Sequence, residues 1–399
     1  MYGVRTMANY YSAVQAAARL KVSRQTLYAY VSRGLLRAHP GESHRDRRYL
    51  IAEVNQLVTR RSHARSPVRA VRGALDWGMP VVESSICAID AGRLYYRGKD
   101  VLSLIDTHSA EDVAALLWQC PKHEAFASVP PLLAKVSIGR SDPNTPKFLV
   151  SSFAMAGRDL PVDSWRVASC RSVRPLGDLV RIMAGCVVRA RADAESLRQQ
   201  CATAWNPAPK NARLVEAALI LCADHELNAS SFTVRCIAST AASLHACLLG
   251  GLAALSGPRH GGMTARVETL WAEVGDAINL KAALRARLER GDDLPGFGHP
   301  LYPDGDIRAS AILESLPGRR QRWRRIAQAV AQLTGQRPSL DFALVALRRH
   351  LQLTVGAAFG IFALGRSMGW IAHALEQRSQ GTLIRPRAAY VGPPPEDLE

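Results

Sequence analysis

Aromatic residues make up only 6% of this chain of 399 residues, and runs that alternate apolar and polar residues, as strands do, are scarce. This scarcity argues against a sheet-rich fold. Apolar residues reach 48%, enough to fill a substantial core, and Ala, Leu, Val and Arg are abundant. Helical periodicity is widespread. The sequence therefore predicts an all-α fold, and its length gives room for two or three domains.

The eight cysteines lack the spacing of a metal site, since none forms a Cys-x-x-Cys pair and none has a histidine at zinc spacing. We expect buried or incidental thiols in a reducing cytoplasm, and no bound metal. The amino-terminus lacks an apolar region followed by a cleavage site, so no secretion signal is evident. A Walker-type glycine motif is also missing, which excludes that way of binding nucleotide phosphates.

One apolar stretch, residues 237–255, is long enough to raise the question of a membrane span. It also contains Ser239, Ser243, His245 and the pair Gly250-Gly251. These polar and small residues favour a buried central helix. We therefore expect no membrane contact.

Positive charge is concentrated at the amino-terminal end. The formal net charge is +17, and residues 1–73 hold 14 lysines and arginines against 3 acidic residues. The stretch 59–69 is polar, basic and interrupted by proline, as a linker would be. We therefore predict an amino-terminal domain over residues 1–61 and a linker over residues 62–77.

The first 61 residues carry a helix-turn-helix pattern. A short helix is expected over 12–20 and a turn over 21–23, after which Ser23 caps a second helix over 24–31. A basic segment that could form a wing follows, and then a third helix from Ile51 to about Arg60. Over residues 10–60 the pattern resembles the MerR-type winged helix-turn-helix. The residues expected to meet DNA are Arg24, Gln25, Thr26, Tyr28, Arg45, Arg47 and Arg48.

DNA binding has an alternative, a small basic helical module used for protein contact or solubility. The helix spacing, the basic wing and the charge excess together favour DNA. Single helix-turn-helix units bind weakly and dimers bind well, so a DNA role requires the rest of the chain to dimerise.

Three islands in the carboxyl-terminal half carry chemistry: Gly257–Gly262, Pro295–Pro300 and Pro338–Phe342. The first two place a histidine among glycines, where backbone and imidazole can both approach a ligand closely. The third places one carboxylate after a proline and before an apolar run of helical character. Two histidines and an acid suit a reaction in which one group removes a carbon-bound proton and others stabilise carbonyl oxygens.

Further motifs appear at residues 225–230, 304–309, 365–373 and 384–387, and from about 80 to 393 the chain resembles the citrate synthase family. The resemblance implies a helical homodimer. It implies a large domain over residues 78–263 and 347–399 and a small domain over residues 264–346. It also implies condensation of acetyl-CoA with oxaloacetate to citrate and coenzyme A, as in the tricarboxylic acid cycle. The coenzyme A thioester would be a co-substrate, and no permanently bound cofactor is expected.

The resemblance also assigns roles. Asp341 matches the base, His260 the group that stabilises the enolate, and His299 the group that acts on the oxaloacetate carbonyl. Oxaloacetate carries two carboxylates, which planar guanidinium groups bind well. Substrate contacts are implied for His225, Arg308, Arg366 and Arg385, the last reaching in from a partner subunit, and coenzyme A contacts for Leu294, Gly296 and Gly298.

The chain departs from the family pattern beside these residues. Met263-Thr264 follows the first island, Ile307 separates Asp306 from Arg308, and apolar residues 343–345 follow the catalytic acid. Drier surroundings raise the pKa of a carboxyl group. Two alternatives stay open: a 2-methylcitrate synthase that uses propionyl-CoA, and a DNA-binding regulator whose citrate-synthase-like dimer senses a metabolite.

Overall fold

A computed structural model of the chain describes residues 10–57, 82–127, 146–157, 174–275 and 277–392, apart from residues 33–34, 41–46, 52–53, 55–56, 191, 193, 206–208, 319–321 and 389. The chain divides into two compact units, Met1–Glu83 and Ser84–Glu399. The linker predicted over residues 62–77 lies outside the described residues.

The first unit contains the predicted helix pair. Helix α1 (Ala13–Leu20) starts at Ser12, which forms a capping box with Gln15, and helix α2 (Arg24–Ser32) starts at Ser23, whose hydroxyl accepts the Thr26 N–H at 3.1 Å. Between them Lys21 adopts a left-handed conformation. The pair forms because each helix has a serine at its start and apolar residues at helical spacing.

A small antiparallel sheet completes this unit, with β3 (Arg47–Leu50) between β1 (Tyr10–Ser12) and β2 (His39–Pro40). Tyr49 of β3 is fully buried with Leu27, Val54 and Leu57. The predicted third helix is helical at residues 51, 54 and 57, and its other residues lie outside the described part. The helix-turn-helix prediction is confirmed in its two described helices.

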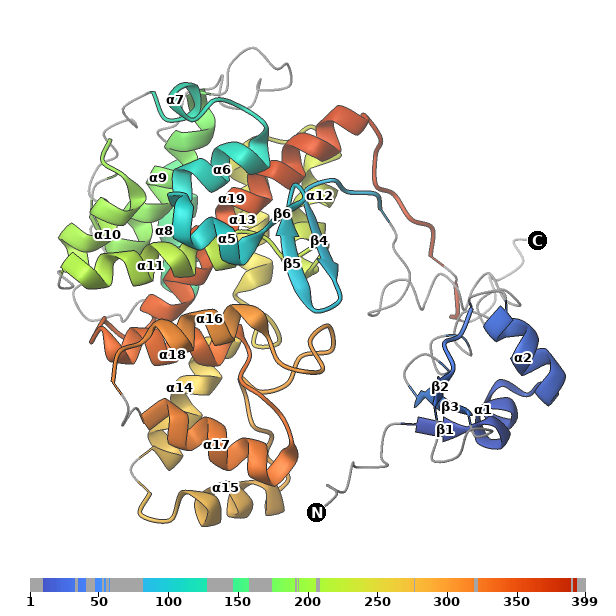
Figure 1. The fold of residues 1–399 in the computed structure, drawn as a ribbon. Helices are drawn as coiled ribbons and strands as arrows, with labels where there is room; N and C mark the ends of the chain where they lie inside the picture. The colour runs from blue at the N-terminus through green and yellow to red at the C-terminus, as the bar shows by residue number, and fades with distance from the viewer. Residues whose placement is uncertain are drawn as a thin grey trace, which may run out of the picture. The chain divides into compact units, whose positions relative to one another are not determined.

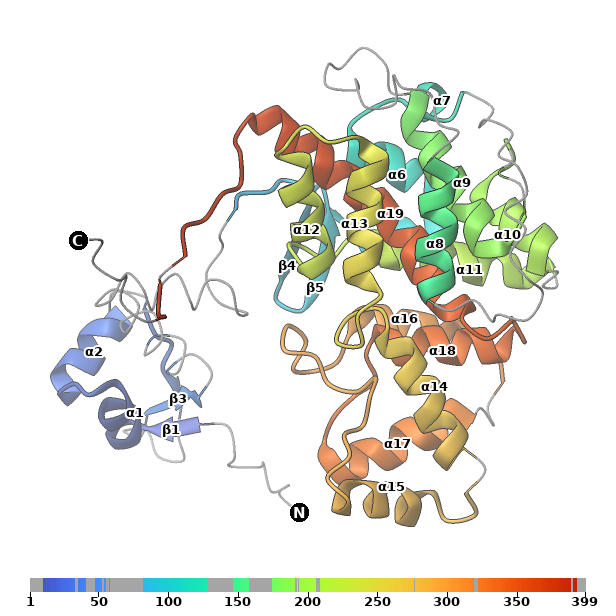
Figure 2. The same ribbon diagram turned by 180° about the vertical axis from the view of Figure 1, so that it is seen from behind.

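The second unit begins with an antiparallel sheet of β4 (Cys87–Asp90), β5 (Arg93–Tyr96) and β6 (Lys99–Asp100), and is otherwise helical, as predicted (Figures 1 and 2). Its helices are α5 (Val101–Thr107), α6 (Ala110–Trp118), α7 (Lys122–Ala125), α8 (Pro146–Ala156), α9 (Arg174–Val188), α10 (Leu197–Trp205), α11 (Pro209–Cys222), α12 (Ala229–Ala238), α13 (Leu244–Leu255), α14 (Met263–Val274), α15 (Leu280–Glu289), α16 (Ile307–Ser315), α17 (Arg322–Thr334), α18 (Leu340–His350) and α19 (Ala357–Gln380).

Helix α19 runs through the middle of the larger helical group and packs against α9, α11, α12 and α13 (Figure 2). Its glycines make this close approach possible. A Cβ on Gly365 would lie 2.5 Å from the Leu219 carbonyl oxygen, and one on Gly369 would lie 2.2 Å from that of Ala223. Because α19 is almost entirely buried, the polar side chains it carries are held rigidly.

Helices α14 to α18 form a second group beside the larger one (Figure 1). Helix α16 packs against α18, and α18 packs against α14 and α19. Helix α18 therefore joins this second group to α19.

The prediction of one buried helix over residues 237–255 is wrong. Helix α12 ends at Ala238, a turn follows, and α13 begins after Ser243, whose hydroxyl accepts the Ala246 N–H at 3.1 Å. Ala241 in the turn has a left-handed φ of 61°. A serine cap and a left-handed residue outweigh the continuous apolar composition. None of the helices in the described residues has the length and apolarity that a membrane crossing requires.

Candidate active site

His260 lies in the tight glycine loop between α13 and α14. The loop closes through the Gly262 N–H, which donates to the Leu255 carbonyl at 3.0 Å, and a Cβ on Gly262 would lie 2.4 Å from the Ser256 carbonyl oxygen. His260 Nε2 lies 2.9 Å from the Ser230 hydroxyl. Burial, with a smaller effect of a nearby arginine, lowers the pKa of His260 to about 3. The imidazole is therefore neutral at neutral pH.

His299 and His225 lie edge to face, with ring centroids 5.2 Å apart. His225 Nε2 lies 3.0 Å from the Tyr302 hydroxyl, and His299 Nδ1 accepts the Leu301 N–H at 3.2 Å. Burial first, and then the charge of Arg308, lowers the pKa of His299 to about 4. A neutral ring whose Nδ1 accepts a hydrogen bond must carry its own hydrogen on Nε2. His299 can thus donate that hydrogen to a ligand.

Arg308 is held by a buried carboxylate. Asp306, 2% exposed, accepts the Arg308 Nε–H at 2.9 Å and the Nη2–H at 2.8 Å. The same carboxylate caps α16 through the Arg308 backbone N–H at 3.0 Å and accepts the Leu340 N–H of α18 at 3.1 Å. One carboxylate therefore caps two helices and fixes the guanidinium between them.

Arg366 is a second buried cation, 1% exposed, on α19. Its Nε–H donates to the Cys222 carbonyl at 2.8 Å, and its guanidinium carbon lies 5.0 Å from the centroid of the Phe362 ring. Among the described residues its Nη1 has no hydrogen-bond partner. Burial lowers the pKa of Arg366, and Asp224 opposes that effect. A buried, unpaired guanidinium nitrogen calls for an anionic ligand.

Asp341 is in the first turn of α18, where its Oδ1 is buried and, within the described residues, has no hydrogen-bond partner. Burial raises the pKa of Asp341 to about 7, although Arg308 works in the opposite direction. The next residue, Phe342, belongs to an apolar cluster with Phe297 and Trp271, whose ring centroids lie 4.7 and 5.4 Å from its own. A carboxyl group with this pKa is suited to take up a proton near neutral pH.

The loop expected to meet coenzyme A contains Leu294, Gly296 and Gly298, and it pairs with the chain just before α18. Gly298 N–H donates to the Arg337 carbonyl and Ser339 N–H donates to the Gly296 carbonyl, each at 2.8 Å. Both glycines have left-handed φ values, of 85° and 75°. The Ser339 side chain makes no capping hydrogen bond. The start of α18 is therefore positioned by this backbone pairing and by Asp306, which accepts the Leu340 N–H.

The structure gathers six of the seven residues predicted to be catalytic or to bind substrate. The positive charges of Arg308 and Arg366 both act on the pKa of Asp341 and of His225. The gathered residues are His225, His260, His299, Arg308, Asp341 and Arg366. Arg385, in contrast, is exposed in the segment after α19, and no contact in the described part of the chain joins it to this cluster.

The residues predicted to meet DNA lie on the first unit. Arg24, Gln25 and Tyr28 of α2 are exposed, and so is Arg47 of β3. Thr26 and Arg48 are partly buried, and Arg45 lies outside the described residues.

Four site residues escaped the sequence analysis: Ser230, Tyr302, Asp306 and Trp370. Three belong to motifs that were recognised, and Tyr302 stands three residues after the second histidine. In the sequence, only their proximity to a motif could have marked these residues as part of the site. Their contacts join distant parts of the chain and leave no local pattern.

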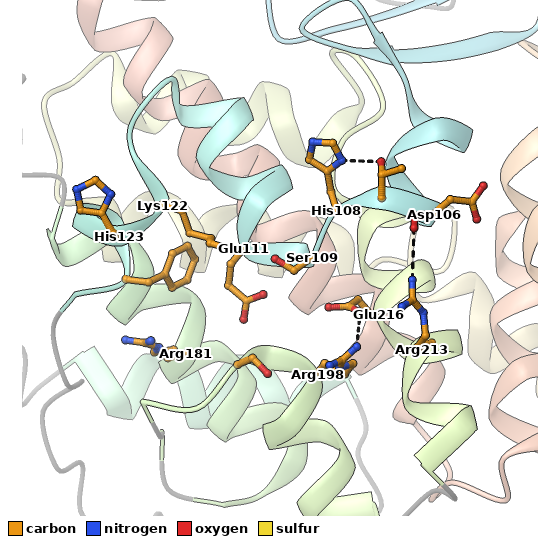
Figure 3. A pocket seen from close by; sticks show the side chains of 13 residues that line it. Asp106, His108, Ser109, Glu111, Lys122, His123, Arg181, Arg198, Arg213 and Glu216 are labelled. Atoms are coloured by element: carbon orange, nitrogen blue, oxygen red, sulfur yellow. Dashed lines mark hydrogen bonds and ion pairs between the residues drawn. The ribbon is translucent and has the colours of Figure 1, made fainter.

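A separate cavity of about 530 Å³ lies among α6, α7, α9, α10 and α11 (Figure 3). None of the predicted site residues lines it. Its central charges already have partners, since Arg198 pairs with Glu216 at 3.2 Å and Glu111 accepts the Leu197 N–H at 2.6 Å. The cavity is thus separate from the cluster of predicted site residues around Asp341.

Comparison with protein families gives two matches. Residues 73–142 and 167–387 match the family model of the citrate synthase C-terminal domain, and residues 10–62 match a helix-turn-helix domain model. A protein named citrate synthase 2 from Bacillus subtilis (strain 168) is 30% identical over 352 residues, which cover 79% of this chain and 95% of that protein. A 2-methylcitrate synthase from Mycobacterium tuberculosis (strain ATCC 25618 / H37Rv) is 37% identical over 186 residues, which cover 44% of this chain and 47% of that protein.

Solved structures resemble the second unit. A citrate synthase from Thermotoga maritima MSB8 superposes with a TM-score of 0.65 and 25% identity over 81% of this chain and 96% of its own. A citrate synthase from Thermoplasma acidophilum, in a complex with carboxymethyl coenzyme A and oxaloacetate, has the same fold with a TM-score of 0.65 and 22% identity, over 80% of this chain and 96% of its own.

Proposed function

The chain belongs to the citrate synthase family, a family of acyltransferases, and we propose that it condenses acetyl-CoA with oxaloacetate to give citrate and coenzyme A. The observation that carries the proposal is the burial of the Asp341 carboxyl group and its lack of a hydrogen-bond partner on Oδ1 within the described residues. A buried carboxylate oxygen without a hydrogen-bond partner in the described residues, beside two buried arginines, is prepared to accept a proton from a bound substrate.

In the first step, Asp341 removes a proton from the acetyl methyl group. A neutral His260 donates a hydrogen bond to the thioester oxygen as negative charge develops there, which is typically worth about 3–4 kcal/mol in the transition state. The methyl group is a very weak carbon acid, so this stabilisation and the alignment of the reactants are both needed.

In the second step, the enol carbon forms a bond to the keto carbon of oxaloacetate. His299 Nε2–H protonates the keto oxygen, in line with its Nδ1 accepting a backbone N–H. Arg308 and Arg366 bind the carboxylates of oxaloacetate and His225 supports the same substrate. Water then hydrolyses the citryl-CoA thioester, which releases citrate and coenzyme A.

The proposed site needs two further arrangements, a partner subunit and the closure of a small domain. Arg385 is exposed, as a residue that reaches into the site of a partner subunit would be, and this supports a homodimer. The segment from α14 to α18, which contains His299, Arg308 and Asp341, would move as a small domain and close on oxaloacetate before acyl-CoA reacts. Leu294, Gly296 and Gly298 would contact coenzyme A through their backbone.

The alternative acyl group is propionyl. The surroundings of Asp341 are apolar, since apolar residues follow it and the rings of Phe297 and Trp271 pack around Phe342. Such surroundings would accommodate the additional methylene of a propionyl group. Coenzyme A release with oxaloacetate, measured in parallel with acetyl-CoA and propionyl-CoA, decides between them. A higher kcat/KM for acetyl-CoA supports citrate synthesis, and the reverse supports 2-methylcitrate synthesis. Release with neither contradicts both.

A second function is favoured by the helix-turn-helix match and the exposed side chains of α2 and β3: DNA binding by the first unit. Arg24, Gln25, Thr26 and Tyr28 would enter a groove, and Arg45, Arg47 and Arg48 would contact phosphates. If DNA binds, Arg24→Ala with Arg47→Ala should lower affinity and reduce the slope of log K against log salt by about 0.9 per lost phosphate contact. Arg290→Ala, an exposed arginine of the second unit, is the matched control. An unchanged slope contradicts the assignment.

A DNA role would also allow the second unit to act as a metabolite sensor. A chain that binds DNA and is stabilised by oxaloacetate, yet releases no coenzyme A, would be a regulator and not an enzyme.

A further inference from the structure

Tyr302 lies among three residues of the proposed oxaloacetate site. Its hydroxyl is 3.0 Å from His225 Nε2, its ring centroid is 5.2 Å from that of His299, and the guanidinium carbon of Arg308 lies 5.4 Å from the same centroid. Only 3% of Tyr302 is exposed. A buried phenol in this position can order the groups around it without touching the reacting atoms.

The hydrogen bond between Tyr302 and His225 joins the two helical groups. His225 lies between α11 and α12 of the larger group, whereas Tyr302 lies just before α16 of the second group. Two turns hold Tyr302 there, since its N–H donates to the His299 carbonyl and its carbonyl accepts the Gly305 N–H, each at 3.0 Å. Helix α11 packs against α16. The hydroxyl and the imidazole therefore meet where the two groups are in contact.

This hydrogen bond can run in either direction, and burial decides between them. If Tyr302 donates to Nε2, a neutral imidazole carries its own hydrogen on Nδ1. If Nε2–H donates instead, the phenol hydrogen needs another acceptor. Among the described residues the Tyr302 hydroxyl makes its hydrogen bond to His225 alone. A buried hydrogen without an acceptor is costly, so the geometry favours donation by Tyr302.

The direction of the hydrogen bond determines what His225 offers a ligand. The ring is neutral, because burial first, and then the charges of Arg308 and Arg366, lowers the pKa of His225 well below its ordinary value. His225 Nδ1 makes no hydrogen bond to the described residues, so a hydrogen on it is free for a ligand. A bare Nδ1 would instead turn a lone pair toward that ligand, and a lone pair repels a carboxylate.

We propose that Tyr302 is a positioning residue that keeps His225 in the Nδ1–H form by donating to Nε2, so that His225 can donate to a carboxylate of oxaloacetate. The inference rests on the proposed binding of oxaloacetate by His225. Because the two residues come from different helical groups, His225 is held in this form only where the groups meet.

The neighbours of Tyr302 hold its ring in place. Arg308 lies over the ring, a contact between a cation and an aromatic face. Asp306 fixes the Arg308 guanidinium through two hydrogen bonds, at 2.9 and 2.8 Å. These contacts do not involve a ligand, so the hydroxyl is aimed at His225 before oxaloacetate binds.

The test combines ring-15N histidine NMR of the full chain with titration calorimetry of oxaloacetate and steady-state kinetics, and His225→Gln identifies the His225 signals. Tyr302→Phe removes the hydroxyl and keeps the ring. Tyr96→Phe is the matched control. The Tyr96 hydroxyl is also buried, and it bonds the Ile220 carbonyl and the Asp224 N–H, so it holds the chain just before His225 without bonding the imidazole.

We expect His225 of the unsubstituted chain to be predominantly in the Nδ1–H form. Tyr302→Phe should bring in the Nε2–H form, because the described residues then offer Nε2 no donor. It should weaken oxaloacetate binding about 10-fold and raise the KM for oxaloacetate by a similar factor, with kcat unchanged, as for a lost hydrogen bond to a charged substrate. Tyr96→Phe should change neither the tautomer nor the affinity. An unchanged tautomer in Tyr302→Phe, or equal changes in both variants, overturns the proposal.

The tautomer and the oxaloacetate affinity are both measured without turnover, so this proposal and the proposed function can fail separately. Coenzyme A release by a chain whose His225 is in the Nε2–H form defeats only the role of Tyr302. An Nδ1–H form that Tyr302→Phe changes, in a chain that releases no coenzyme A, supports the positioning and defeats the proposed function. If Tyr302→Phe does not fold, the unsubstituted chain still decides, because a predominant Nε2–H form of His225 there contradicts the proposal.

Discussion

Asp306 accepts a hydrogen bond from the backbone N–H of Leu340, 34 residues further along the chain, at 3.1 Å. Leu340 immediately precedes Asp341, and the same carboxylate holds the Arg308 guanidinium. Asp306 therefore anchors two things: the start of α18, which carries the proposed base, and Arg308, the proposed substrate arginine. A change at Asp306 should disturb both.

Asp306→Asn should lower the free energy of unfolding by about 3–5 kcal/mol, because it leaves the buried Arg308 without its counter-charge. Urea unfolding measures the loss. Asp293→Asn is the control: its ion pair with Arg266 is exposed and should contribute less than about 1 kcal/mol. Equal losses in the two variants would show that Asp306 is not an anchor.

Asp341→Asn should stabilise the fold, and more so at alkaline pH. The pKa of Asp341 is raised by burial from 3.8 to about 7, so its stabilising contribution is full below pH 3.8 and is lost as pH rises through 7. Between pH 5 and pH 8.5 the gain in unfolding free energy from the substitution should grow by roughly 1 kcal/mol or more. A gain that does not vary with pH would contradict the buried, uncompensated carboxylate.

Arg366→Ala should weaken oxaloacetate binding by about 2–5 kcal/mol, because the buried guanidinium would no longer meet a substrate carboxylate. Isothermal titration with oxaloacetate measures this. Arg378→Ala removes a partly buried arginine from the same helix, where it donates to the Ala242 carbonyl, and should leave oxaloacetate affinity unchanged. Similar losses in both variants would point to a general effect on α19.

Much of this architecture could be predicted from sequence. The two helices of the first unit begin at serines, and α1 ends at the left-handed Lys21; these signals are local. The family resemblance is confirmed by the match over most of the second unit. It named six residues that the structure gathers, because each of them stands in one of the short motifs that carry the resemblance.

The contacts between motifs could not be predicted. Asp306 reaches Leu340, and Trp370 reaches a serine 140 residues away, only because α16, α18, α12 and α19 pack together. The break between α12 and α13 was missed for a different reason: uniformly apolar composition hides the periodicity that would mark two helices. The role proposed for Arg385 depends on a partner subunit, and a single sequence contains no record of where such a subunit would lie.

The central claim, that Asp341 is the base, is tested most directly by the pH dependence of kcat/KM for acyl-CoA in the unsubstituted chain and in Asp341→Asn. In the unsubstituted chain kcat/KM should rise with pH and level off above about 7, since the carboxyl group must lose its proton to act. Asp341→Asn should lower kcat/KM by about 10²–10⁴ and abolish the inflection. Turnover by Asp341→Asn at the unsubstituted rate, or an inflection that persists in it, would contradict the assignment.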